Sequence, residues 1–94
     1  MPKNWLDRIR DCIRRRHYYM SAHAMEEMAE DLLDIVDIEA AILSGTIDRM
    51  EKEDPRGTKY VVIGFADDQR TPVGIVGRFV DESQFLIITV YVVT

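Results

Sequence analysis

The strongest constraint on the fold of this chain is a change of hydrophobic period at Gly45. Before this glycine, apolar residues recur every three or four positions, which is typical of amphipathic helices. After it, short apolar runs are separated by turn sequences such as EDPRG and DESQ, which is typical of strands. A chain of 94 residues suits one domain. We therefore expect a single α+β domain over residues 1–94, with helices at about 4–44 and a sheet at about 46–93.

Two or three helices are predicted in the first half of the chain. Asn4, Ser21 and Asp34 are suitable N-caps, and each precedes apolar residues at helical spacing. Gly45 fits the position just after a helix, where glycine commonly ends it. The predicted helices therefore begin near residues 5, 22 and 35.

Four strands are predicted in the second half, at about 47–52, 59–66, 73–80 and 85–93. The connections between them are too short for the crossover that parallel neighbours need. We therefore predict a four-stranded antiparallel meander with the helices packed on one of its faces.

The last predicted strand is apolar at eight of its nine positions, so both of its faces need cover. Either it is a central strand of the sheet, or its outer face pairs with another chain. On this ground we expect a homo-oligomer formed through the C-terminal strand, or a bound partner.

The net charge of −5 is unevenly distributed. Residues 1–20 hold six Lys or Arg and two Asp, whereas residues 21–94 hold six Lys or Arg and fifteen Asp or Glu. An acidic protein repels nucleic acid as a whole. The basic first segment is the exception, and Arg14, Arg15 and Arg16 are its densest part. These arginines are either a surface for a phosphate chain or an acidic partner, or the solvated face of an amphipathic helix.

The expected location is cytoplasmic. The one cysteine, Cys12, cannot form an internal disulfide, which favours a reducing compartment. The N-terminal residues show no signal-peptide pattern, and no apolar run is long enough for a membrane span. Phosphate loops, paired-cysteine zinc motifs and dinucleotide fingerprints are also absent from the sequence. We therefore expect no cofactor, no bound metal and no membrane association.

His23 is the first candidate for a functional side chain. With Ser21 as the N-cap, His23 lies in the first helical turn, where the helix dipole disfavours imidazolium. A neutral ring could act as a base. Glu26 and Glu27, three and four residues further on, oppose that effect. The alternative is a structural histidine that packs over the helix–sheet seam with both nitrogens satisfied.

Tyr19, Tyr91 and Arg78 are further candidates. The two tyrosines have apolar rings and polar tips, and both could reach the rim of the helix–sheet seam. Arg78 interrupts an otherwise apolar strand. If the strand face that carries Arg78 meets the helices, the guanidinium needs a carboxylate or an external phosphate. If that face meets water, Arg78 indicates little about function.

Several short runs together resemble a known bacterial family, the domain-of-unknown-function family 4258. The first run is Y-x-x-S-x-H-A-x-x-x-M at 18–28, which includes Ser21 and His23. The others are DIEAAILSG at 37–45, KYVVIG at 59–64 and IITVY at 87–91. Family members look like small proteins of toxin–antitoxin modules. Their helix-then-sheet plan is similar to that of RelE/ParE/BrnT-type toxins, which include ribosome-dependent mRNA endonucleases.

The resemblance implies an antitoxin or other protein partner, action on RNA or translation, and, if the protein is an enzyme, metal-independent ribonuclease chemistry. It implies His23 as general base, Tyr91 or Tyr19 as proton donor, and Arg78 on the phosphate. Ser21 belongs to the same motif as a binding residue, and the three consecutive arginines at 14–16 would guide RNA electrostatically.

The chain also departs from the family pattern H-A-x-x-R-M-x-E-R-G-I-S. Glu27 and Asp31 stand at its two arginine positions, Leu32 at its glycine, and Gly74 where the third strand often carries a histidine. Replacing two cations by two anions changes the local charge by four units, which opposes phosphate binding. These departures favour an alternative function, a non-catalytic module with a toxin-like fold that binds a protein partner.

Overall fold

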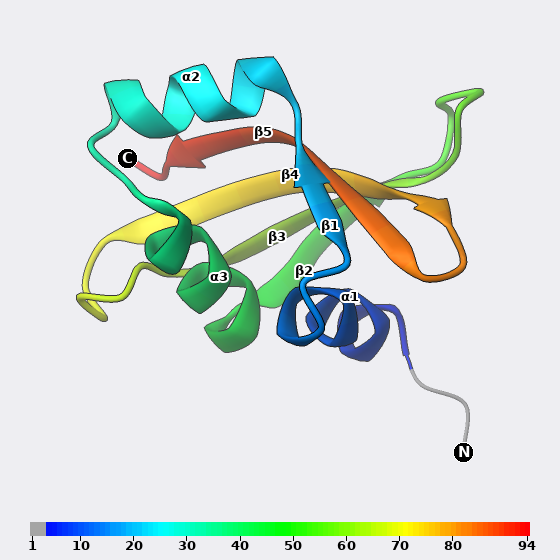
Figure 1. Cartoon of the computed structure of the whole chain (residues 1–94), viewed down its shortest axis with the longest axis horizontal. Coiled ribbons are helices and arrows are strands. Elements are labelled where there is room, and N and C mark those ends of the chain that lie inside the picture. Colours follow the sequence, from blue (N-terminus) through cyan, green and yellow to red (C-terminus); the bar gives the residue numbers. More distant parts are fainter. Residues whose placement is uncertain (1–3) are drawn as a thin grey trace.

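The computed structural model describes residues 4–94 and shows helices packed around a curved sheet (Figure 1). Lys3, part of the basic N-terminal segment, lies outside the described residues. The helices are α1 (Trp5–Arg14), α2 (Ala22–Glu30) and α3 (Ile35–Ser44). The strands are β1 (Tyr18–Met20), β2 (Thr46–Glu51), β3 (Lys59–Phe65), β4 (Pro72–Asp81) and β5 (Gln84–Val92).

All three predicted N-caps are confirmed. The side chain of Asn4 accepts a hydrogen bond from the Asp7 amide at 2.8 Å, and Ser21 Oγ accepts one from the Ala24 amide at 3.0 Å. Asp34 and Asp37 form a reciprocal capping box at the start of α3. Each helix therefore begins where a short polar side chain satisfies a free backbone amide.

Gly45 ends α3 as predicted, but for a different reason. Its backbone is extended, with φ −89° and ψ −176°, and not left-handed. A Cβ atom at this position would lie 2.5 Å from the Ile63 carbonyl oxygen and 2.6 Å from that of Ala41. Glycine is needed here because the backbone of β3 passes close to the end of the helix.

The sheet has five strands in the order β1-β5-β4-β3-β2, and it is mixed. β1 runs parallel to β5, and the other neighbours are antiparallel. The prediction of four antiparallel strands is therefore wrong, although the α+β class is right. The missed strand, Tyr18–Met20, is too short for an alternating pattern to show. Short connections exclude parallel pairing only between strands that are consecutive in the chain, which β1 and β5 are not.

β5 takes an internal position in the sheet. Residues 85–87 pair with β1. Beyond β1, the Ser21 amide donates to the Ile87 carbonyl at 2.9 Å, and Ser21 Oγ donates to the Ile88 carbonyl at 2.8 Å. Glu27 Oε1 accepts from the Val90 amide at 3.2 Å. The chain thus covers this edge itself, and the expected homo-oligomer stays a prediction.

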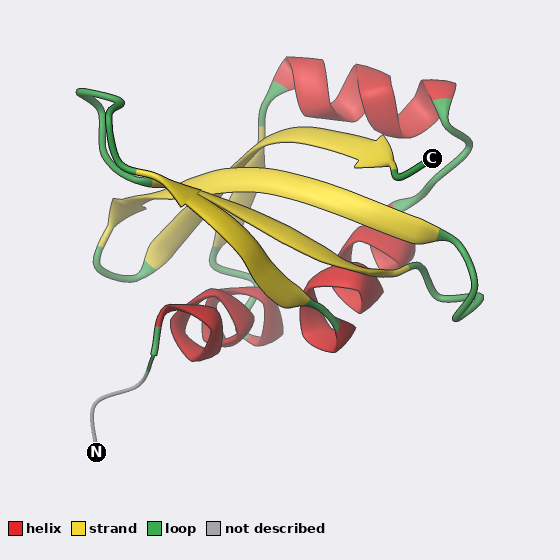
Figure 2. Cartoon of the chain, turned by 180° about the vertical axis from the view of Figure 1, so that it is seen from behind, coloured by secondary structure: helices red, strands yellow, loops and turns green. Residues whose placement is uncertain are grey.

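The core lies between the sheet and helices α1 and α3, and it includes Ala24 of α2, which runs along β5. Its largest fully buried side chains are Phe85, Ile9, Ile38, Ile42, Ile75 and Ile87. We call the opposite face of the sheet the open face. Figure 2 shows this side, where no helix lies in front of the strands. None of the described helices is long and apolar enough to cross a membrane.

Candidate functional site

Arg78 lies on the open face. Along β4, Val73 and Ile75 belong to the buried core and Phe79 packs against it. Side chains alternate between the two faces of a strand, so Arg78 projects from the other side. The sequence left open whether the strand face that carries Arg78 packs against helices or meets water. The structure excludes packing of this face against α1 and α3.

A row of side chains crosses the open face at the level of Arg78. Arg78 pairs with Leu86 of β5, and Leu86 pairs in turn with Tyr19 of β1. Tyr19 lies on the same face because Tyr18 and Met20, on either side of it, pack against the core. Arg78 also lines a surface pocket of about 150 Å³, which we call the Arg78 pocket. Its lining residues are Ser21, Asp54, Arg56, Lys59, Arg78, Leu86 and Ile88.

The cations of the Arg78 pocket differ in their partners. Lys59 Nζ lies 3.7 Å from Glu51 Oε1 and 3.6 Å from Asp54 Oδ2. Arg56 Nε lies 3.4 Å from Asp54 Oδ1. The Arg78 side chain is half-buried, and its guanidinium makes no hydrogen bond or ion pair to any of residues 4–94. Its guanidinium therefore has all five N–H donors available for a group from outside.

Tyr91 lies on the same open face, in a row further along the sheet. It pairs with Gly74 of β4, and a Cβ atom on Gly74 would lie 2.2 Å from Tyr91 Cζ. The tyrosine ring therefore lies across the glycine. This contact gives a physical reason why the chain has glycine at position 74, where the family pattern often has histidine. A histidine there would displace the Tyr91 ring.

His23 is placed differently from the other candidates. It lies in the first turn of α2, its side chain is 66% exposed, and its Nε2 is 3.3 Å from Glu27 Oε1. The same carboxylate oxygen accepts a hydrogen bond from the Val90 amide of β5. His23 is not among the residues that line the Arg78 pocket. The His23 ring therefore contacts the Glu27 carboxylate, which also joins α2 to β5.

Ser21 and Tyr19 have partners within the protein. Ser21 Oγ caps α2 and also donates to the Ile88 carbonyl, so its hydroxyl proton is already used. The Tyr19 hydroxyl donates to Gln84 Oε1 at 3.1 Å, and its ring is exposed. Ser21 therefore positions the wall of the Arg78 pocket, whereas Tyr19 offers a ring face to solvent.

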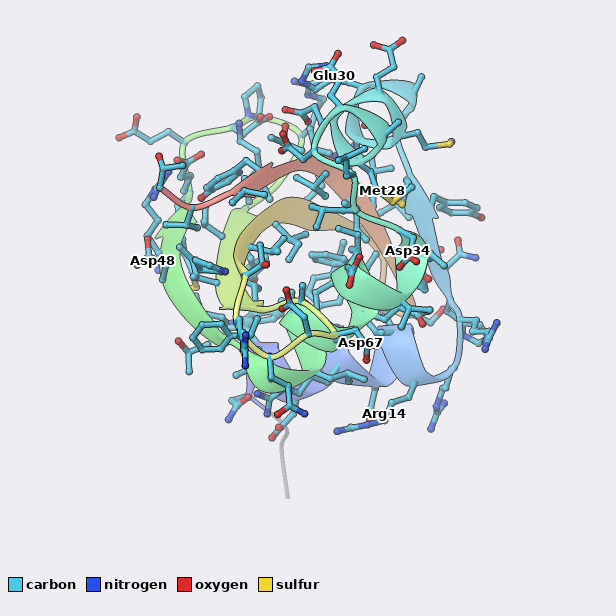
Figure 3. The ribbon with its side chains drawn as sticks, turned by 90° about the vertical axis from the view of Figure 1, so that its left-hand side faces the viewer. Arg14, Met28, Glu30, Asp34, Asp48 and Asp67 are labelled. Atoms are coloured by element: carbon cyan, nitrogen blue, oxygen red, sulfur yellow. The ribbon has the colours of Figure 1, made fainter. Side chains whose placement is uncertain are left out.

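Arg14, Arg15 and Arg16 lie apart from the Arg78 pocket. Arg14 is the last residue of α1, a helix on the other side of the sheet (Figure 3), and Arg15 and Arg16 follow it. All three are exposed. Arg14 Nη1 lies 3.7 Å from Asp11 Oδ1. The role of these arginines as an electrostatic guide stays a prediction.

Sequence reasoning missed Lys59 and Arg56 as parts of a site. Both belong to the run KEDPRGTK, which was interpreted as a turn and the start of a strand. Their proximity to Arg78 depends on the pairing of β3 with β4, which composition does not reveal. Within residues 4–94, no three His, Cys, Asp or Glu side chains come together as ligands for a metal ion.

A protein-family model described as a domain of unknown function, DUF4258, matches residues 20–92. The chain belongs to the DUF4258 family. The match includes Ser21, His23, Arg78 and Tyr91, and it leaves α1 outside. Comparisons of this DUF4258 protein with curated proteins and with solved structures find no match.

Proposed function

We propose that this protein binds phosphate groups of RNA in the Arg78 pocket, as part of a toxin-like action on RNA or translation. The observation that carries the proposal is the half-buried Arg78, whose guanidinium has no partner among residues 4–94 and lies beside Lys59 and Arg56. A partly buried charge without a partner is unfavourable. A phosphate would relieve this cost because its oxygens accept two parallel hydrogen bonds from one guanidinium.

The surroundings of the pocket favour a single strand of RNA. Tyr19 and Tyr91 lie on the same face, in rows roughly 15 Å apart along β5. Bases of single-stranded RNA stack on exposed aromatic rings while cations hold the backbone. A short segment could therefore bind with a phosphate at Arg78 and a base on either ring.

Cleavage of the bound RNA is a separate prediction. It needs a base, a proton donor and a cation around one phosphate. Of the proposed catalytic residues, Arg78 lines the pocket, whereas His23 lies outside its lining and contacts Glu27. We therefore propose RNA binding as the function, with cleavage by His23 as an untested addition.

RNA binding is tested by fluorescence anisotropy with a labelled eight-nucleotide oligo-uridine and the full chain. Loss of the charged hydrogen bonds in Arg78→Gln should weaken binding about tenfold or more. Arg70→Gln, which removes a cation from the turn between β3 and β4, is the matched control and should bind as the parent does. Equal affinity of Arg78→Gln and the parent, or no binding by the parent at low salt, would contradict the proposal.

The role of His23 is tested by induced expression in a bacterial host at equal protein levels. A toxin that uses both residues arrests growth, and both His23→Ala and Arg78→Gln relieve the arrest. If both variants stay as toxic as the parent, the proposed mechanism is wrong. Relief by Arg78→Gln alone would support RNA binding without a catalytic histidine.

The second candidate function is a non-catalytic protein-interaction module. The observation that favours it is on α3, which exposes apolar side chains on the side opposite the core. A protein partner would cover this surface.

A further inference from the structure

We propose that the outward side of α3 is a docking surface for a basic amphipathic helix of another protein. This proposal rests on the second candidate function and gives it a surface and a partner class. The surface lies on the side of the sheet opposite the Arg78 pocket, so the two proposals can fail independently.

Helix α3 is apolar on both of its sides. Ile38, Ala41 and Ile42 are buried in the core. Val36, Ala40 and Leu43, at spacings of four and three residues, lie on the opposite side. Val36 is 49% exposed and Leu43 is 38% exposed. Since surface helices normally carry polar residues on that side, the exposed apolar row indicates a surface that a partner covers.

The exposed row continues before the start of α3. Leu32, in the connection that precedes the helix, is 91% exposed. Near the end of the helix, Ala40 and Ser44 line a groove of about 420 Å³ together with Ala66 and Asp67. We call the four residues Leu32, Val36, Ala40 and Leu43 the α3 stripe.

The charges around the α3 stripe select a basic partner. From residue 17 to residue 48 the chain has eight Asp or Glu and no Lys or Arg. On the helical projection, Glu39 lies to one side of the stripe and Asp37 to the other. The Asp67 amide donates to Asp37 Oδ1 at 3.1 Å, and Asp67 lines the same groove as Ala40. Arg70 is the one cation in that turn.

These features together describe a helix-in-groove interaction. An apolar row at intervals of three and four residues fits the apolar side of a partner helix. Carboxylates on both sides of the row fit Lys or Arg on that helix. A second copy of this chain fits less well, because a two-fold contact through the same surface would bring both sets of carboxylates together.

The probe is a fluorescent 18-residue peptide of Leu and Lys, with the leucines on one helical side. A scrambled peptide of the same composition and a Leu/Glu peptide of the same pattern are the controls. In titrations with the full chain we expect at least tenfold weaker binding of both control peptides. Equal binding of the scrambled peptide would show attraction by charge alone and would overturn the proposal, as would no binding of the Leu/Lys peptide.

Variants locate the binding to the α3 stripe. The double variant Val36→Ser, Leu43→Ser removes apolar groups that are already exposed, so the fold should persist. We expect its peptide affinity to fall at least tenfold, while its RNA affinity stays unchanged. Val80→Ser, which removes an exposed valine at the end of β4, is the matched control and should leave peptide binding unchanged.

Two results would overturn the proposal at this step. One is equal peptide affinity of the double variant and the parent. The other is a dimer of the parent, seen by sedimentation velocity, that the double variant abolishes, because a second copy would then cover the stripe.

Discussion

At the scale of single residues, Leu32 holds a backbone conformation that suits glycine. Its φ is 57°, in the left-handed region. That conformation costs a non-glycine residue about 1–2 kcal/mol, whereas glycine loses about 0.5–1 kcal/mol more conformational entropy on folding. We therefore expect Leu32→Gly to raise the free energy of unfolding by about 0.5–1 kcal/mol in urea denaturation. Leu32→Ala keeps its Cβ and should give no such gain; a less stable Leu32→Gly would contradict this account.

Asp68 gives a prediction on pH. Its carboxylate accepts hydrogen bonds from the Thr71 hydroxyl at 2.6 Å and from the amides of Thr71 and Arg70. These bonds, the Thr71 hydroxyl first, lower the pKa of Asp68 to about 2. The ordinary pKa of Asp is about 3.9. The folded pKa is the lower one, so the stabilisation is complete above about pH 4 and is lost as the pH falls towards 2.

Asp68→Asn should therefore be less stable than the parent at pH 7, and the difference should narrow between pH 4 and pH 2. Urea denaturation at several pH values measures both proteins. A difference that stays constant over this range would show that the ionised carboxylate does not stabilise the fold.

At the scale of elements, the contact between α2 and β5 depends on Glu27. Without the Glu27 carboxylate, the Val90 amide has no acceptor on the edge of β5 that β1 does not cover. We expect Glu27→Ala to destabilise the fold by about 0.5–1.5 kcal/mol and to speed hydrogen exchange at Val90. Glu26→Ala, on the same helical turn, should leave this exchange unchanged. Unchanged exchange at Val90 in Glu27→Ala would mean that another group covers the strand edge.

The elements also show what sequence could predict. Helix starts depend on local caps such as Ser21, and β3, β4 and β5 depend on long apolar runs. The sequence therefore predicts both the helix starts and these three strands. β1 was missed because a three-residue strand exists only through its pairing with β5. The functional candidates on the open face were predictable only in part, because some of them come together through strand pairing. Arg78 and Tyr91 stand out in the sequence, whereas Lys59 joins them only once the strand register is known.

At the scale of the whole molecule, the structure separates two surfaces. The open face carries Arg78, whose guanidinium has no partner among residues 4–94, although the chain as a whole is acidic. The α3 stripe lies on the other side, where Asp37 and Glu39 flank exposed apolar residues. RNA and a basic protein would therefore not compete for one site.

The most direct test of RNA binding at the open face is a two-dimensional ¹H–¹⁵N NMR titration of the chain with oligo-uridine. We predict that the largest chemical-shift changes fall on the Arg78 side-chain Nε–H and on the amides of Lys59 and Leu86. Changes centred on Arg14–Arg16 or on α3 would contradict this prediction, and so would a spectrum that RNA leaves unchanged.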